Sequence, residues 1–151
     1  MENTLLSNHF KLGEFLNLGK YSDNIPTMQH VANMTYGCLM LLEPARQVVG
    51  PIIINSGFRN AQVNRQVGGV SGSQHLLGQA ADIRPKDPAQ FQRLVNYLKT
   101  CEYTDQLSRE RIRLSSEGND FSVGFLFGEL AEMQYLCRQL ERYESEIRII
   151  L

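Results

Sequence analysis

The residues with the clearest chemical potential are a histidine and a carboxylate on either side of a glycine-containing loop. His75 is followed seven residues later by Asp82, which lies inside the apolar string Ala-Ala-Asp-Ile. A carboxylate in such surroundings costs free energy unless it is exposed, paired or bound to a metal. Gly78 permits a tight turn between the two residues. One nitrogen and one oxygen ligand suit Zn²⁺, so a zinc site at His75 and Asp82 is one interpretation of this spacing.

Two further polar residues, Arg59 and Ser73, could act on a ligand at this site. Arg59 follows a tight turn after an isoleucine-rich segment, and a guanidinium there can hold a carboxylate or a developing oxyanion with two parallel hydrogen bonds. Ser73 could donate another hydrogen bond to the same ligand. The structural alternative is that His75 caps a loop and Asp82 pairs with Arg84.

Two short strands are predicted to position these residues. Residues 51–56 contain three consecutive isoleucines bounded by turn residues, and residues 79–84 form a second apolar run that Pro85 stops. The chain between them, residues 57–77, is rich in glycine and polar residues and is predicted to be loop. A third strand is predicted over residues 103–107, and an apolar run occupies residues 121–127.

Helices are predicted on three segments. Residues 27–49 carry apolar side chains at spacings of three and four, and Pro44 should kink or divide that helix. Asp87 and Pro88 suit the N-cap and first position of a second helix that ends near Cys101. Residues 129–143 form the third candidate. The pattern predicts an α+β fold in which helices flank a small antiparallel sheet, with the site on loops at one sheet edge.

Composition limits the classes of function. A chain of 151 residues and 17.2 kDa is expected to form one domain. The net charge of -1 gives no reason to expect nucleic acid as a partner, and no apolar stretch is long enough for a membrane span. Three widely spaced cysteines predict reduced thiols, and the first residues lack the pattern of a signal peptide. A cytoplasmic location is therefore the default expectation.

The longest recognisable pattern in the chain is S-x-H-x-x-G-x-A-x-D at residues 73–82, preceded by S-G-F-R at residues 56–59. This pattern resembles the zinc D-Ala-D-Ala carboxypeptidase and murein endopeptidase family, especially its small phage and bacterial members with the hedgehog-like peptidase fold. The likeness extends over residues 8–107 and includes Asp23-Asn24, residues 41–46 and residues 105–107.

The resemblance implies a metallopeptidase that acts on peptidoglycan stem or cross-bridge peptides. His75 and Asp82 would be two of three protein ligands to zinc, Arg59 would be the catalytic residue that binds substrate near the scissile amide, and Ser73 would assist it. Zinc would polarise the peptide carbonyl and activate a water, while an acid/base residue relays the proton. Action on the cell wall by a cytoplasmic chain would need another factor for release, as in phage endolysins.

The third ligand of that family is a histidine in a W-x-H-like strand soon after the D-Q-L segment, and here the sequence differs. No histidine follows His75, the chain has no tryptophan, and His9 and His30 precede the first strand. An inactive homologue that binds cell-wall peptides without hydrolysis is therefore the alternative function. Five other residues could supply the ligand: Glu110, Glu117, Asp120, Glu129 and Cys137.

The end of the chain differs in character from the rest. All lysines and prolines lie before residue 100, and the basic residues after residue 107 are only arginines. We therefore expect a peptidase-like part over residues 1–107 and a divergent segment of the same domain over residues 108–151. One hypothesis is that this segment is out of register with the ancestral reading frame or was replaced. A W-x-H string in another frame of the gene would support that hypothesis. The oligomeric state stays open.

Overall fold

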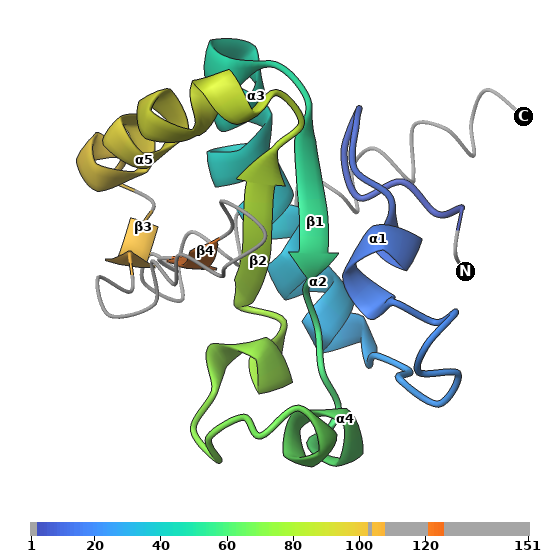
Figure 1. The fold of residues 1–151 in the computed structure, drawn as a ribbon. Helices are drawn as coiled ribbons and strands as arrows, with labels where there is room; N and C mark the ends of the chain where they lie inside the picture. Colours follow the sequence, from blue (N-terminus) through green and yellow to red (C-terminus); the bar gives the residue numbers. More distant parts are fainter. Residues whose placement is uncertain (1–2, 103, 108–120, 126–151) are drawn as a thin grey trace, which may run out of the picture.

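The fold is α+β, with one antiparallel sheet and helices packed around it (Figure 1). The computed structural model describes residues 3–102, 104–107 and 121–125. Within this part of the chain the sheet has four strands in the order β1-β2-β4-β3. The strands are β1 (Ile52–Ser56), β2 (Ala80–Pro85), β3 (Thr104–Leu107) and β4 (Phe121–Phe125). The predicted fold class is confirmed.

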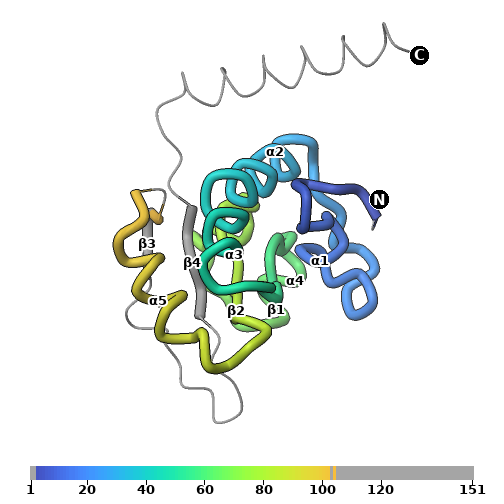
Figure 2. The backbone as a smooth tube through the Cα atoms, turned by 90° about the horizontal axis from the view of Figure 1, so that it is seen from above, coloured from blue at the N-terminus to red at the C-terminus, as the bar shows by residue number. Residues whose placement is uncertain are grey.

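Helices lie behind the sheet and along its edges. Figures 1 and 2 show α2 and α3 behind β1 and β2, with α1 beside β1 and α5 on the side of β3. The helical elements are α1 (Leu12–Leu16), α2 (Met28–Gly37), the π-helical turn η1 (Cys38–Leu42), α3 (Glu43–Val49), α4 (Ala61–Gln66), the 3₁₀ turns η2 (Gln74–Leu77) and η3 (Pro88–Gln90), and α5 (Phe91–Thr100). None of the described helices is long and apolar enough to cross a bilayer.

The helical run predicted over residues 27–49 is present and is interrupted near Pro44, as expected. Thr27 caps α2, where its hydroxyl accepts from the backbone N–H of His30 and its own N–H donates to His30 Nδ1. Pro44 occupies the first turn of α3, where a missing N–H is tolerated. The wider turn η1 lies immediately before it and accommodates the break. Gly50, with φ of 78°, ends the run.

The alternation of side chains in β2 separates the core from the site. Ala81 and Ile83 are fully buried among the helices, whereas Asp82 between them is partly exposed on the opposite face. Strand β1 pairs with β2 through Ile54 opposite Ile83, and a bulge at the next step places Ser56 opposite Asp82. This bulge brings the end of β1 beside the carboxylate.

Several sequence predictions need correction or lie outside the described residues. Residues 57–77 are not loop throughout, because α4 and η2 form there. Asn60 caps α4 by accepting from the N–H of Val63 at 2.9 Å, a short-range signal that the glycine-rich composition obscured. The second predicted helix begins as η3 with Asp87 as its cap and continues as α5. The predicted helix over residues 129–143 lies outside the described residues.

Candidate functional site

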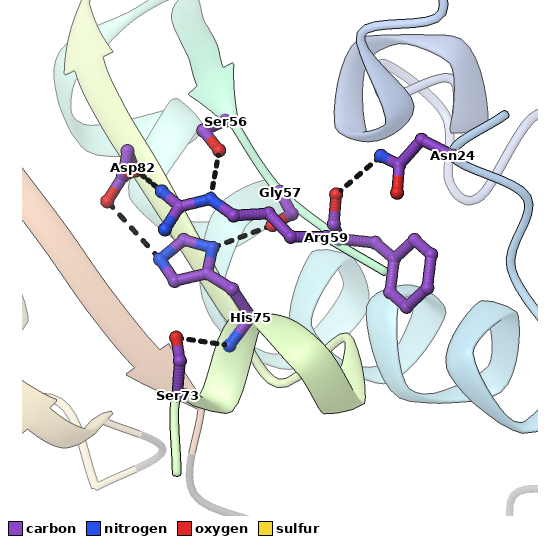
Figure 3. A network of polar contacts seen from close by, with 8 residues as sticks. Asn24, Ser56, Gly57, Arg59, Ser73, His75 and Asp82 are labelled. Carbon is purple, nitrogen blue, oxygen red and sulfur yellow. Dashed lines mark hydrogen bonds and ion pairs between the residues drawn. The ribbon is translucent and has the colours of Figure 1, made fainter. Parts of the chain in front are cut away.

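The fold brings His75 and Asp82 together at one end of the sheet. His75 lies on η2 and is buried, and Asp82 lies on β2. His75 Nε2 is 3.4 Å from Asp82 Oδ1. Figure 3 shows the imidazole directed toward the carboxylate from the loop side of the strand. Two residues that the sequence separates by a glycine-containing loop therefore share one small volume.

A backbone carbonyl fixes the orientation of the His75 ring. His75 Nδ1 lies 2.6 Å from the carbonyl oxygen of Gly57. A carbonyl only accepts hydrogen bonds, so Nδ1 carries the proton, and in the neutral ring the lone pair is on Nε2. A Cβ at Gly57 would lie 2.6–2.8 Å from atoms of Phe15, so only glycine fits at this contact. The S-G-F-R motif thus presents Nε2 toward Asp82.

Asp82 forms an ion pair with Arg59. One guanidinium nitrogen of Arg59 donates to Asp82 Oδ2 at 2.6 Å, and Arg59 Nε donates to Ser56 Oγ at 3.0 Å. Only 12% of the Arg59 side chain and 23% of the Asp82 side chain are exposed, so solvent screens this pair weakly. The structural alternative expected Arg84 as the partner of Asp82, whereas Arg84 Nε donates to the side-chain oxygen of Asn55 at 3.3 Å.

Ser73 lies beside His75 as the cap of η2. Its hydroxyl oxygen accepts from the backbone N–H of His75 at 3.3 Å, and Gly78 ends the turn with φ of 68°. The backbone N–H of Arg59 also donates to the carbonyl of His75 at 3.0 Å. Ser73 therefore sets the start of the turn that carries the imidazole, and its predicted contact with substrate stays a prediction.

A buried amide that sequence reasoning did not single out holds the loop around Arg59. Asn24 is 1% exposed, and its Nδ2 donates at 2.8 Å to the carbonyls of Leu16 and Phe58. Its Oδ1 accepts from the N–H of Asn60, also at 2.8 Å. The residues before and after Arg59 are thus both bonded to one side chain. Figure 3 shows Asn24 beside the loop that carries Arg59. The only sequence signal was the likeness of Asp23-Asn24 to the carboxypeptidase pattern.

The geometry of His75 and Asp82 can be compared with what zinc requires. Two ligands at about 2.0–2.2 Å from a tetrahedral ion are separated by about 3.3–3.6 Å. The 3.4 Å between His75 Nε2 and Asp82 Oδ1 falls in this range. Arg59 bonds the other carboxylate oxygen, Oδ2. The pair fits two corners of a zinc site, with Nδ1 of the histidine anchored to a carbonyl as metal-binding imidazoles usually are.

A third corner is not found among the described residues, where no group of three or more His, Cys, Asp or Glu side chains could hold a metal. His9 Nδ1 instead lies 2.8 Å from Glu43 Oε2, and the His30 ring stacks on Phe58 with centroids 4.5 Å apart. The five substitute ligands considered above, Glu110, Glu117, Asp120, Glu129 and Cys137, all lie outside the described residues.

Strand β4 completes the sheet next to Asp82. The backbone of Ser122 pairs with that of Asp82, and Gly124 pairs with Ala80. Paired residues in antiparallel strands lie on the same face of the sheet. Position 122 is therefore the neighbour of the carboxylate on the side away from Ser56. The sequence marked residues 121–127 only as an apolar run, although apolar side chains at positions 121, 123 and 125 have the spacing of a strand.

A helix–sheet fold with a buried histidine next to a partly exposed aspartate and an arginine is consistent with the family that the sequence suggested. The chain belongs to the Peptidase M15 family, whose sequence profile matches residues 9–114. It is also similar to a zinc D-Ala-D-Ala carboxypeptidase of Streptomyces albus G, with 46% identity over 44 residues. The matched segment covers 28% of this chain and 17% of that relative.

Proposed function

We propose that this chain is a zinc-dependent peptidase acting on peptidoglycan peptides, at a bond of the D-Ala-D-Ala carboxypeptidase or murein endopeptidase type. The 3.4 Å separation of His75 Nε2 and Asp82 Oδ1, which equals that of two ligands on one tetrahedral ion, carries the proposal. Membership of the Peptidase M15 family and the similarity to a zinc D-Ala-D-Ala carboxypeptidase support it.

Each side chain of the site would have its own role in this reaction. Zinc held by His75 and Asp82 would supply polarisation of the scissile carbonyl and activation of a water. Asp82 pairs with the Arg59 guanidinium through Oδ2, and its other oxygen, Oδ1, faces His75 and can bind a cation. Arg59 uses two of its five N–H donors on Ser56 and Asp82, and the others can bind a substrate oxygen near the scissile amide. Ser73 assists from the start of η2.

A second function follows from one observation. The described residues hold only two of the three protein ligands that a catalytic zinc requires. A chain with this site would recognise cell-wall peptides through Arg59 without hydrolysing them. The two functions would use the same residues, and only the first would include hydrolysis of the peptide.

Metal analysis and a turnover assay test the proposal together. The purified chain is dialysed with zinc, its metal content is measured, and release of D-alanine from an acylated Lys-D-Ala-D-Ala peptide is followed. We expect close to one zinc per chain and its loss in His75→Ala, with Cys101→Ser unchanged as the control. Less than about a tenth of a zinc per chain would contradict the metal site. Peptide binding with no release at any zinc concentration would establish the non-hydrolytic function.

A further inference from the structure

A small cavity adjoins the candidate site on the other side of the Arg59 side chain. Its volume is about 190 Å³, and its lining includes Arg59 and Ser56 but neither His75 nor Asp82. Pockets that enclose whole small-molecule ligands have volumes of about 300–1,000 Å³. This cavity therefore fits one side chain of a larger ligand that also reaches the metal site.

The lining combines apolar and polar residues. Phe15, Phe58 and Val63 are buried, whereas Tyr21 and Asn55 are partly exposed and Lys20 is exposed. Lys20 Nζ lies 5.2 Å from the centre of the Tyr21 ring, which restricts where the ammonium can be. A ligand group with both apolar surface and a charge would match both kinds of residue.

The charges in the cavity favour an anion. Its lining includes two cations, Lys20 and Arg59, and no aspartate or glutamate. The Arg59 charge is balanced by Asp82 at 2.6 Å. In the part of the chain that the structure describes, no carboxylate lies within ion-pair distance of Lys20. One positive charge beside the site is thus available to a ligand.

We propose that this cavity is a specificity subsite for a carboxylate-bearing residue of the substrate peptide, with Lys20 as its charged partner. The inference rests on the proposed function, because it places an acidic residue of the substrate peptide in a cavity beside the site. Peptidoglycan stem peptides occur with a free or an amidated carboxylate on their D-glutamate. Lys20 would make the chain sensitive to that difference.

The test compares two synthetic stem pentapeptides that end in D-Ala-D-Ala and differ only in whether the α-carboxylate of D-glutamate is free or amidated. Binding to the zinc-loaded full chain is measured by calorimetry. We expect the free carboxylate to bind at least about threefold more tightly, as for one partly exposed charge pair. Lys20→Gln should abolish the preference. Lys99→Gln, an exposed lysine on α5, should keep it.

The outcomes separate this inference from the proposed function. Equal binding of both peptides to the wild-type chain, or a preference that persists in Lys20→Gln, would overturn the subsite and leave the peptidase proposal standing. Binding of neither peptide would overturn the peptidase proposal. In that case, titration with glutarate followed by NMR decides the subsite. Shifts that Lys20→Gln removes would support an anion site, and their absence would refute it.

Discussion

The third corner of the metal site can be supplied by a single substitution in β4. Position 122 pairs with Asp82 in the antiparallel sheet, so it lies on the same face. Side chains at such paired positions have Cβ atoms about 4.5–5.5 Å apart, within reach of an imidazole. Ser122→His should therefore place a third ligand next to His75 and Asp82 and raise the affinity of the chain for zinc.

The size of the effect follows from the number of ligands. Structural zinc sites with four ligands bind with about 10–16 kcal/mol, or about 2.5–4 kcal/mol per ligand. Adding one ligand to the two that the described residues supply should tighten zinc binding by about 10²–10³-fold. The expected gain is nearer the lower limit, since the new side chain loses rotamer freedom when it coordinates.

Competition with a chromophoric chelator measures zinc affinity over this range. Ser122→Ala is the matched control and should bind zinc as the wild-type chain does. In the double variant Ser122→His, His75→Ala, the gain in zinc affinity over the wild-type chain should largely disappear, because both imidazoles bind the same ion. A change of less than about tenfold in Ser122→His, with the variant folded, would refute the placement of the metal at Asp82 on the face that position 122 shares.

Three further substitutions test the structure, two near the site and one at the start of α3. Gly57→Ala should destabilise the chain by about 1–3 kcal/mol in denaturant unfolding, because its Cβ would overlap Phe15, whereas Gly72→Ala, with nothing within 4 Å, should change little. Asn24→Leu should lower the free energy of unfolding by about 2–4 kcal/mol in the same measurement, because it leaves buried carbonyl and N–H groups without partners. An unchanged stability would show that the hydrogen bonds of Asn24 do not hold this loop. Burial alone would raise the pKa of Glu43, but hydrogen bonds from Ser7 and His9 outweigh it and lower the pKa below the usual 4.5. The stability that ionised Glu43 contributes is thus present above about pH 4.5 and is lost as the pH falls through the lower folded-state pKa. In thermal unfolding, the melting temperature of the wild-type chain should therefore exceed that of Glu43→Gln by less in acid than at neutral pH. A difference in melting temperature that stays constant with pH would contradict this.

The two strands of the site could be predicted from the sequence because their composition favours strands. Three isoleucines form β1, and the alanines around Asp82 permit close packing in β2. The carboxylate in an apolar strand indicated a partner, and the structure shows it beside Arg59 and His75. Local composition therefore predicted the two strands and indicated that Asp82 has a partner.

Contacts between distant segments could not be predicted in this way. Asn24 bonds residues 34 and 36 positions away, and no periodicity encodes such a contact. The bulge that places Ser56 opposite Asp82 depends on register, which the two strands set together. The pairing of Asp82 with position 122 depends on β4, a strand that the sequence suggested only by its apolar residues.

The position of Arg59 determines how its substitution must be interpreted. A guanidinium that only bound substrate could be removed without effect on the metal, and Arg59→Ala would then separate peptide recognition from zinc binding. Here Arg59 bonds Asp82 Oδ2 while Asp82 Oδ1 faces His75. Its removal would take away one of the bonds that orient the carboxylate and would alter both functions at once. Lys20, which lines the cavity and is not bonded to Asp82, is therefore the better residue for separating recognition of the peptide from binding of the metal.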